Sequence, residues 1–281
     1  MNYSMDIDLR QMQTCQLNIL KEFQKVCQAN HLTFYLAFGS CLGAVRHHGF
    51  IPWDDDVDVF MRIEDIRKLV GLQDQFPPHL YIQTHEKEPE YGLLITRIRN
   101  SLTTLIEIDH CDRDINQGVY IDIYPLYYYG GSWIHRRAQL VCSFVSRLFT
   151  YNRAPMNKGI FPTVVSRILL NIFPRSIKEF IAKKTFSFLT SYHSAEYIAT
   201  IPDLSDGRYY PSEVFGEPLM CQFEDVVLPI PTKPDEFLRR RYGEYMLLPP
   251  EEQRIIHHNY VFVDLNNSYL KYRGIKYLQK I

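Results

Sequence analysis

The sequence lacks the cysteine spacings of a zinc ribbon or a thiol-redox centre. Its six cysteines are scattered, and no two of them form a C-x-x-C pair, so neither class of site is expected. Unpaired thiols of this kind are typical of the reducing cytosol. Residues 1–10 contain two aspartates and no apolar segment, which is not the pattern of a secretory signal. The sequence therefore predicts a cytoplasmic protein that is not exported.

Long apolar runs, internal repeats and low-complexity tracts are absent as well. The most apolar segments, 140–149 and 164–173, fall short of the roughly 20 residues that cross a bilayer. Hydrophobic residues still make up 46% of the 281 residues, which is ample for a core. Because this length exceeds that of a usual single domain, we predict a core domain with a large insertion or a second subdomain.

The net charge is only −1, but the charge is unevenly distributed. Residues 133–187 contain ten Lys or Arg and one acidic residue, Glu179, which gives this segment a net charge of +9. Apolar residues recur in it at helical spacing, namely Leu140, Val141, Phe144, Val145, Leu148 and Phe149. This pattern predicts contact with an anionic membrane surface or an anionic lipid-linked acceptor; the alternative is an ordinary helical subdomain with solvated cations. No nucleic-acid-binding motif accompanies the charge, so no nucleic-acid partner is expected.

The most informative stretch, residues 38–61, reads FGSCLGAVRHHGFIPWDDDVDVFM. Residues 33–38 are rich in β-formers and predict a buried strand, which Gly39 and Ser40 would end just before a helix. A glycine allows close backbone approach to a ligand, and the amides at a helix N-terminus attract anions. The Gly-Ser turn is therefore predicted to bind phosphate.

A dense carboxylate cluster follows at Asp54, Asp55, Asp56 and Asp58. Because Val57 and Val59 alternate with the acids, a strand here would place Asp56 and Asp58 on one face. Crowded carboxylates repel one another, so such a site normally holds a cation, and hard oxygen ligands favour Mg²⁺ or Mn²⁺ over zinc. We predict that Asp56 and Asp58 are catalytic metal ligands, whereas Asp54 and Asp55 are either further ligands or part of a solvated turn.

A third carboxylate lies in the segment GVYIDIYP, residues 118–125. Asp122 stands between Ile121 and Ile123 in a predicted central strand, where an unpaired charge is costly. Three carboxylates from neighbouring strands can bind metal and also position or deprotonate an attacking hydroxyl. Asp122 is therefore predicted to be a catalytic base or a third metal ligand; the alternative is an aspartate that caps the turn before Pro125.

These segments resemble the signature of the LicD family, phosphocholine transferase-like enzymes related to fukutin and the fukutin-related protein. Besides GSCLGAVRHHGFIPWDDDVDV, the matching segments are TRIRNSLTT at 96–104, GVYIDIYPL at 118–126, FEDVVLPIPTKPDEFLRRRYGEYM at 223–246, LPPEEQR, and His257-His258. The resemblance covers most of the chain. It implies a nucleotidyltransferase-like fold in which Gly39 and Ser40 form the phosphate turn and Asp56, Asp58 and Asp122 surround Mg²⁺ (or Mn²⁺).

The resemblance also implies an activity, the transfer of a phospho-substituent such as phosphocholine from a CDP-linked donor to a sugar hydroxyl, with release of CMP. The acceptor would be a bacterial surface glycan precursor, lipid-linked or free, as in lipopolysaccharide, teichoic acid or capsule synthesis. The enzyme would act in the cytoplasm or at the inner face of the cytoplasmic membrane. Two alternatives stay open: a D-x-D glycosyltransferase that uses a nucleotide-sugar, and a catalytically silent glycan- or lipid-binding protein of the same fold.

Several basic and aromatic residues are further site candidates. Arg46 and Arg97 are predicted to contact donor phosphates, since arginine can bind phosphate in a bidentate manner. The remaining candidates are His47, Trp53, Arg99, His257 and His258. The two adjacent histidines cannot both face one way, so at most one of them is expected to enter the site.

The predicted fold class is α+β, a nucleotidyltransferase-like mixed sheet flanked by helices, with a largely helical basic insertion. The predicted domains are a core over 1–131, the insertion over 132–200, and a C-terminal part over 201–281 that completes the core and the acceptor side. The predicted elements are helices over 8–30 and near 63–75, strands near 80–84, 93–98 and 119–124, a basic helical region over about 132–195, and a hairpin within 210–232 followed by a helix that ends near Gly243.

Overall fold

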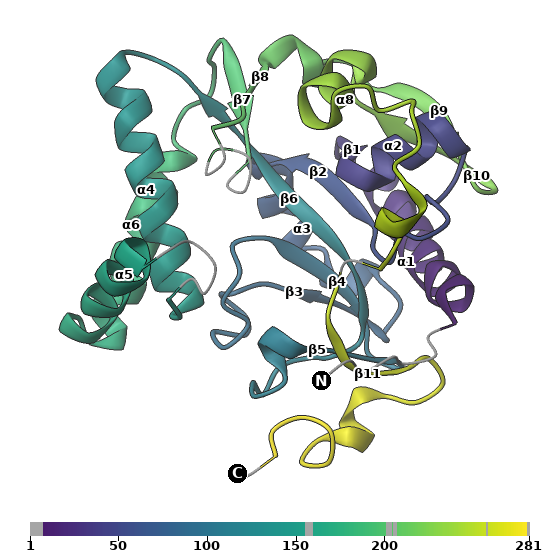
Figure 1. The fold of residues 1–281 in the computed structure, drawn as a ribbon, viewed down its shortest axis with the longest axis horizontal. Helices are drawn as coiled ribbons and strands as arrows, with labels where there is room; N and C mark the ends of the chain where they lie inside the picture. The colour runs from purple at the N-terminus through teal and green to yellow at the C-terminus, as the bar shows by residue number, and fades with distance from the viewer. Residues whose placement is uncertain (1–7, 155–159, 201–203, 205–206, 257, 280–281) are drawn as a thin grey trace. The chain divides into compact units, whose positions relative to one another are not determined.

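The computed structural model describes residues 8–154, 160–200, 204, 207–256 and 258–279. Contacts group the chain into two compact units. The first unit comprises Met1–Gln83, Ile95–Tyr124 and Glu213–Ile281, and the second comprises Thr84–Leu94 and Pro125–Ser212. Each unit contains both helices and strands, so the predicted α+β class is confirmed (Figure 1). The division at residues 131 and 200 stays a prediction.

The first unit is built on a sheet with the strand order β1-β2-β6-β4-β3. The strands are β1 (Phe34–Leu36), β2 (Asp58–Arg62), β3 (Leu80–Gln83), β4 (Thr96–Asn100) and β6 (Val119–Tyr129). Their apolar side chains, among them Val59, Ile98 and Ile121, are fully buried. Because β2 and β6 are neighbours in this order, the sheet brings Asp58 and Asp122 onto adjacent strands.

Helix α1 (Leu9–Ala29) forms where the sequence predicts an amphipathic helix. The Asp8 carboxylate accepts a hydrogen bond from the Gln11 N–H and so caps its first turn. Met12, Ile19 and Phe23 recur at helical spacing and are buried. Two buried glutamines of α1 contact the loop that precedes β2.

Helix α2 (Phe38–His47) begins two residues after β1 ends at Leu36. The predicted strand over 33–38 is therefore shorter than expected, and Gly39 and Ser40 lie in the first turn of the helix. Glycine is also needed near the other end of α2, because a Cβ on Gly43 would lie 2.4 Å from the Gly49 carbonyl oxygen. This close approach lets the chain turn back towards β2.

The first unit also contains helices and strands that are not part of this five-strand order. They are α3 (Ile63–Val70), β5 (Thr104–Glu107), β9 (Leu219–Phe223), β10 (Val226–Ile230), α8 (Pro234–Tyr242) and β11 (Tyr260–Asp264). As predicted, β9 and β10 form a hairpin, and α8 ends directly before Gly243. The pairing of β5 with β11 is not predicted from the sequence, and it places Glu107 opposite Tyr260.

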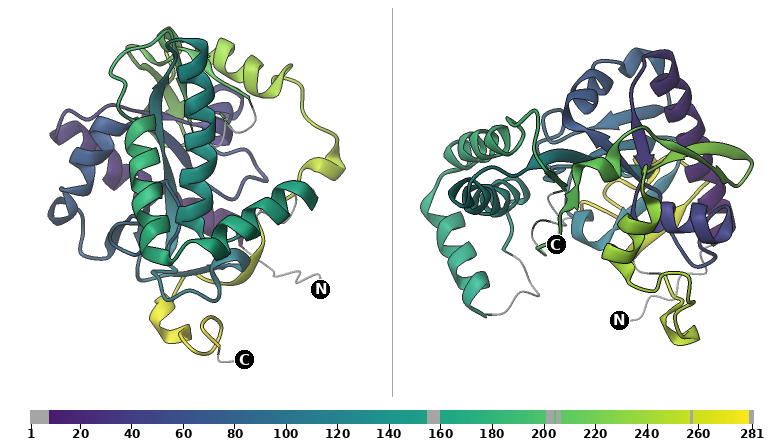
Figure 2. Two further views of the ribbon diagram at one scale, coloured as in Figure 1. Left: turned by 90° about the vertical axis from the view of Figure 1, so that its left-hand side faces the viewer. Right: turned by 90° about the horizontal axis from the view of Figure 1, so that it is seen from above.

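The second unit contains the basic helical region. Its helices are α4 (Trp133–Tyr151), α5 (Ile160–Ile172) and α6 (Arg175–Leu189), and its strands β7 (Tyr197–Ala199) and β8 (Tyr210–Pro211) continue from the end of β6. Helices α4 and α6 lie side by side (Figure 2, left). Leu148, Phe149 and Ala182 form a buried cluster within this unit. The predicted helical character of the segment is thereby confirmed.

Candidate active site: an acidic loop between α2 and β2

The acidic loop, residues 54–56, is held to α1 through its backbone. Gln13 Nε2 donates a hydrogen bond to the Asp54 carbonyl oxygen (2.9 Å), and Gln16 Nε2 donates to that of Asp55 (2.9 Å). Both glutamine side chains are buried, so these bonds give hydrogen-bond partners to amide N–H groups that cannot reach water. The loop backbone is thus fixed, while its carboxyl groups are left for other partners.

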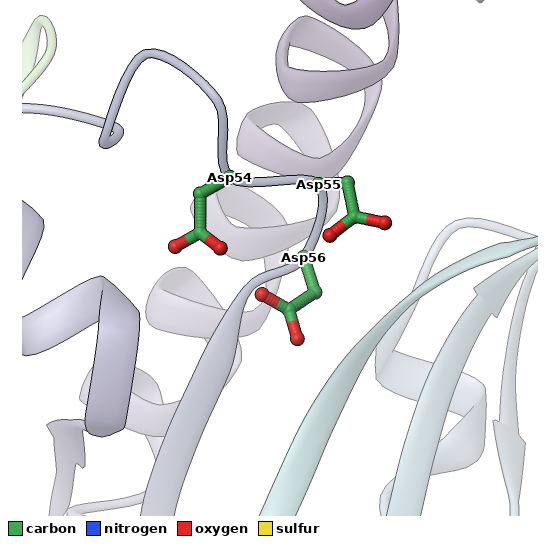
Figure 3. Close-up of side chains that lie close together, drawn as sticks. All are labelled: Asp54, Asp55 and Asp56. Atoms are coloured by element: carbon green, nitrogen blue, oxygen red, sulfur yellow. The ribbon is translucent and has the colours of Figure 1, made fainter. Parts of the chain in front are cut away.

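The three carboxyl groups of the acidic loop lie close together (Figure 3). One oxygen from each of Asp54, Asp55 and Asp56 lies within 4.8 Å of the other two. The sequence predicts Asp56 and Asp58 on one strand, but β2 begins only at Asp58. Asp56 therefore approaches the site from the loop, because two residues of the expected strand do not join the sheet.

Gly39 explains how α2 comes so close to this loop. A Cβ at Gly39 would lie 2.5 Å from Asp54 Oδ2, so a larger residue would displace the carboxyl group. The sequence predicts close backbone approach at this glycine, and in the structure the neighbour is Asp54. The first turn of α2 therefore lies against the acidic cluster.

Asp58 is buried at the start of β2, with one oxygen unpaired. Ser40 Oγ accepts a hydrogen bond from the Asp58 backbone N–H (2.9 Å), which fixes the strand start against α2. Asp58 Oδ1 is buried and has no hydrogen-bond partner among the described residues. A buried acceptor without a partner is costly in a folded protein. The side chain is therefore poised for a ligand that the protein itself does not supply.

Burial and mutual repulsion raise the pKa values of three acids in this site. Burial, with the charges of Asp56 and Asp55, raises the pKa of Asp54 to about 8. Burial also raises the pKa of Asp56, to about 6, although the His258 charge opposes this shift. Burial, followed by the charges of Asp56 and Asp122, raises the pKa of Asp58 well above its usual value. Without a counter-ion, the fold disfavours ionisation of all three.

A divalent cation fits this set of donors. Asp54 and Asp56 offer carboxylate oxygens within the cluster, and Asp58, two residues after Asp56, offers an oxygen that is buried without a partner among the described residues. A hard cation such as Mg²⁺ prefers oxygen ligands, and its charge would remove the repulsion that raises the pKa values. These three side chains are the residues that could hold a metal ion.

The metal-free protein should lose stability as the pH rises. Asp54 and Asp56 have pKa values of about 8 and about 6 in the folded state, against about 3.9 in an unfolded chain. Groups raised in this way stabilise the fold while protonated, so the stability is present below about pH 4 and lost as the pH passes about 6 and then about 8. Since Mg²⁺ needs ionised ligands, the increase in Tm that it causes should be larger at about pH 8.5 than at about pH 6.

Thermal unfolding with and without Mg²⁺ at the two pH values measures this difference. Asp74→Asn is the matched control, because Asp74 is an exposed acid outside the acidic loop. It should leave the pH dependence of the Mg²⁺ effect unchanged, whereas Asp54→Asn should reduce it. An increase in Tm that is equal at both pH values would contradict the prediction.

Asp55 is engaged by two side chains from the C-terminal part of the chain. His258 Nδ1 lies 3.1 Å from Asp55 Oδ1, and the Tyr260 hydroxyl donates to Oδ2 (2.7 Å). Burial alone would raise the pKa of Asp55, but the hydrogen bonds from His258 and Tyr260 and the His258 charge hold it below its usual value. Asp55 therefore serves to anchor the acidic loop, and its oxygens are occupied.

His258 is held as a cation by this contact. Burial opposes its charge, but the hydrogen bond to Asp55 and the charge of Asp56 raise the pKa of His258 to about 9. Its Nε2 lies 3.7 Å from Asp56 Oδ2, so the imidazolium bridges two acids of the loop. Of the two predicted histidines, His258 is in the site, whereas His257 lies outside the described residues.

Asp122 is paired with an arginine on the neighbouring strand. Arg97 lies directly opposite it in the β4–β6 ladder, and Arg97 Nε donates to Asp122 Oδ1 (2.6 Å). The same guanidinium donates to Glu107 Oε2 (2.5 Å), which also receives the Tyr120 hydroxyl on its other oxygen (2.8 Å). All of these side chains are largely buried. Arg97 therefore holds the Asp122 carboxylate in place, and Glu107 in turn holds Arg97.

Arg99 shares a strand face with Arg97, as predicted, and lies 3.9 Å from Glu107, but its hydrogen bonds go to other groups. Both guanidinium groups lie over the Tyr120 ring, at 3.6 Å for Arg97 and 4.7 Å for Arg99. Arg99 donates to Gln83 Oε1 (2.5 Å) and to the Gly118 carbonyl oxygen (2.6 Å). Because Arg99 is fully buried among these groups, it contributes to the sheet interior.

The remaining candidates gather at the other end of α2. Arg46 Nη1 donates to the Tyr245 carbonyl oxygen (2.6 Å), and Arg46 Nε donates to His47 Nε2 (2.9 Å). The His47 ring lies 6.2 Å from the Trp53 ring, and the Arg254 guanidinium lies over the same indole at 5.5 Å. These residues form a cationic and aromatic neighbourhood directly before the acidic loop in sequence.

Three residues of the site have no clear signal in the sequence. Tyr260 and Glu107 lie opposite each other because β5 pairs with β11. One weak signal exists for Tyr260: it follows His258 by two residues, and side chains two residues apart on a strand lie on the same face. At the end of α8, burial and the charges of Asp58 and Asp54 raise the pKa of Tyr242, although the Arg241 charge opposes this shift. Only a tertiary contact identifies these side chains.

Comparison with known proteins yields a family and several relatives. The model of the LicD/FKTN/FKRP nucleotidyltransferase domain matches residues 31–141. The chain is 29% identical over 270 residues to the lipopolysaccharide cholinephosphotransferase LicD of Haemophilus influenzae, covering 90% of this chain and 96% of that protein. Over 56 residues it is 41% identical to the mouse ribitol 5-phosphate transferase FKRP, covering 18% of this chain and 11% of that protein.

An uncharacterised protein of Rickettsia prowazekii, RP689, is 33% identical over 69 residues, covering 25% of this chain and 26% of that protein. The matched domain contains α2, the acidic loop, β2 and the strand that carries Asp122. The similarity to LicD covers 90% of the chain and therefore extends well beyond this domain. Residues 31–141 thus match the nucleotidyltransferase domain of the LicD/FKTN/FKRP family, and the similarity to LicD spans most of the chain.

Proposed function

We propose that this protein is a metal-dependent phosphotransferase. It transfers a phospho-substituent, such as phosphocholine, from a CDP-linked donor to a sugar hydroxyl of a bacterial surface glycan precursor, and it releases CMP. The observation that carries the proposal is the carboxyl cluster of Asp54, Asp55 and Asp56, with the buried Asp58 two residues further on, inside the family domain. Similarity over 90% of the chain to a protein named lipopolysaccharide cholinephosphotransferase supports the substrate class.

Asp56 and Asp58 are the proposed ligands of Mg²⁺ or Mn²⁺, with Asp54 as an additional donor. When bound, such an ion neutralises phosphate charge and orients the phosphoryl group for displacement. Gly39 and Ser40 contribute by shaping the site: the first allows Asp54 to approach α2, and the second fixes the backbone of Asp58. The amides in the first turn of α2 are proposed to attract the donor phosphates.

Asp122 is the proposed third carboxylate, which accepts the proton of the sugar hydroxyl or completes the ligand set. Its position is set by Arg97, which lies opposite it in the ladder. Because Arg97 is already held between Asp122 and Glu107, we assign it to the orientation of Asp122. Arg46 remains the proposed contact for the donor, since arginine is well suited to bind phosphate.

The structure is consistent with more than one transferred group. The mouse protein FKRP, which is similar to 18% of this chain, is named as a transferase of a different substituent, ribitol 5-phosphate.

The test is therefore a panel that includes CDP-choline and CDP-ribitol, incubated with Mg²⁺ and a glycan acceptor, with CMP release as the readout. CMP formed by wild type but not by Asp56→Asn supports the proposal. Release of a nucleoside diphosphate from a nucleotide-sugar would instead show a glycosyltransferase.

Asp122→Asn should lower turnover much more than donor affinity. A residue that accepts a proton or holds charge in the transition state contributes to kcat and little to ground-state binding. We expect kcat to fall by at least about a hundredfold, with the Kd of the donor changed by less than about threefold. Steady-state kinetics and direct donor titration measure the two quantities. A loss of donor binding at unchanged kcat would make Asp122 a binding residue.

A further inference from the structure

Helix α4 exposes apolar residues and buries polar ones. The exposed fraction is 65% for Trp133, 69% for Ile134 and 62% for Val141. Four of its six buried residues are polar, namely Gln139, Ser143, Ser146 and Thr150, and the other two are Leu148 and Phe149. A helix on the surface of a soluble protein has the opposite pattern, with its apolar side towards the core. The outward apolar side of α4 therefore needs an explanation other than packing within the unit.

The buried polar side of α4 is accounted for by the unit itself. Gln139 Nε2 donates to the Tyr128 carbonyl oxygen (2.9 Å), and Gln139 Oε1 accepts from the Gly130 N–H (3.3 Å). The small side chains of Ser143 and Ser146 are buried on the helix that packs along α6. Ser146 Oγ donates to the Ser143 carbonyl oxygen (3.2 Å), whereas Ser143 Oγ and Thr150 Oγ1 are buried without a partner among the described residues. The inner side of the helix is thus packed within the unit, and the exposed apolar side chains take no part in that packing.

Helices α5 and α6 repeat the feature. Val164, Ile168 and Ile172 of α5 recur every four residues and are exposed. Ile177 and Phe180 of α6 are exposed as well, three residues apart on the helix. Helices α4, α5 and α6, whose course is drawn in Figure 2, therefore each present large apolar side chains to solvent. Repetition on these three helices distinguishes this surface from the scattered exposed apolar residues of ordinary proteins.

Cations accompany these apolar side chains. The Arg137 guanidinium lies over the Trp133 ring at 5.8 Å, and the Lys184 ammonium lies over the Phe180 ring at 5.7 Å. Across residues 133–187 ten Lys or Arg stand against one acid, Glu179. That acid is paired with Arg175 (2.9 Å). Of these cations Lys178 is buried and Lys158 lies outside the described residues. The remaining eight stand against one acid, so the surface combines positive charge with apolar residues.

We propose that this surface, formed by the exposed apolar residues of α4, α5 and α6 and their neighbouring cations, docks onto an anionic lipid membrane. Anionic headgroups attract the cations, while apolar side chains enter the boundary of the acyl chains, where tryptophan is especially favoured. A second copy of the chain is a poorer occupant, because two surfaces of the same positive charge repel. Among the described helices none has the length and apolar character needed to cross a bilayer, so the contact is peripheral. This proposal does not depend on the proposed transfer reaction.

Co-sedimentation with vesicles tests the proposal on the full chain. Wild type should bind vesicles of phosphatidylcholine with about 30% phosphatidylglycerol at about 0.05 M salt, and binding should weaken at about 0.5 M salt. Arg137→Gln/Lys184→Gln should weaken binding by roughly tenfold to thirtyfold, from about 1 kcal/mol for each cation. Ile134→Ser/Phe180→Ser should weaken it by at least about tenfold and leave the salt dependence in place.

Two matched controls make the result specific. Arg67→Gln/Lys68→Gln removes the same charge from exposed positions on α3, and Leu102→Ser/Leu270→Ser removes exposed apolar side chains outside the helical unit. Both should bind vesicles as wild type does, and all variants should keep the wild-type Tm. The proposal is overturned if wild type ignores anionic vesicles at low salt, or if the controls lose binding equally. It is also overturned if light scattering shows a dimer that Ile134→Ser/Phe180→Ser converts to a monomer, because the occupant is then a second copy.

Discussion

Replacing Asp58 with asparagine should abolish transfer without unfolding the protein. The change removes a proposed metal ligand, so we expect a loss of at least about a thousandfold in kcat/KM, equivalent to roughly 4 kcal/mol of barrier. It also removes a buried carboxyl whose ionisation is opposed by burial and by the charges of Asp56 and Asp122. The metal-free variant should therefore melt at the same temperature as wild type or higher, and Mg²⁺ should stabilise it less.

Asp55→Asn is the informative comparison, because Asp55 lies in the same cluster but has protein partners. It loses charge-assisted hydrogen bonds from His258 and Tyr260, so its metal-free Tm should fall. Opposite changes in Tm for the two substitutions would separate a ligand from an anchor. Activity of Asp58→Asn within about threefold of wild type, or a large fall in its metal-free Tm, would show that Asp58 has no metal-binding role.

Local sequence patterns predict the elements that surround the acidic loop. The apolar residues around Asp58 indicate a buried strand, and β2 begins at this residue. Alternation also places Arg97 and Arg99 on one strand face, where both lie over Tyr120. Such features can be predicted because side-chain direction within one strand depends only on local geometry. The hairpin β9–β10 and the end of α8 are predicted for the same reason, from turn residues and glycine.

The partners of the acids cannot be predicted in this way. Tyr260 and Asp55 are 205 positions apart in the chain and meet because β11 pairs with β5. Glu107 lies in a strand that the sequence does not indicate, and only the sheet shows that it shares Arg97 with Asp122. Long-range strand pairing depends on the whole fold, and propensity carries little information about it. The distinction between a proposed ligand, Asp58, and an anchored acid, Asp55, therefore needs the structure.

In the basic helical unit, the sequence pattern does not predict which apolar side chains are buried. Leu140, Val141, Phe144 and Leu148 recur at helical spacing, which predicts one apolar face. In the structure Leu148 is buried, whereas Val141 and Phe144 are exposed. A helical pattern identifies the helix, but it does not determine which side of the helix faces the core. In α4, serine and glutamine side chains occupy part of the side that packs inside the unit. Only burial shows that apolar side chains of α4 lie on both sides of the helix, and the exposed ones are the observation on which the proposed membrane contact rests.

Arg97→Met should be the most destabilising single change in the sheet. Arg97 is buried between two carboxylates, with Nε 2.6 Å from Asp122 Oδ1 and Nη1 2.5 Å from Glu107 Oε2. Burial would raise the pKa of Glu107, but the Arg97 charge and the hydrogen bonds from His110 and Arg97 hold it well below its usual value. Methionine keeps most of the volume but leaves Asp122 without its ion-pair partner, and Glu107 with only Tyr120, His110 and the more distant Arg99. Breaking buried ion pairs in this way costs about 3–5 kcal/mol.

For a chain of this size the predicted loss corresponds to a fall in Tm of roughly 6–20 °C, measured by calorimetry. Arg240→Met is the control, because Arg240 forms an exposed ion pair with Glu236 (2.9 Å), and exposed pairs contribute at most about 1 kcal/mol. Adding Glu107→Gln to Arg97→Met should recover part of the stability, since one unpaired charge is removed. It should not recover transfer, because Asp122 still lacks the guanidinium that orients it, and misplacement of a reacting group by about 1 Å can cost a hundredfold in rate. If Arg97→Met changes Tm no more than the control does, the buried ion pairs do not hold the sheet together, and Asp122 must be positioned by other contacts.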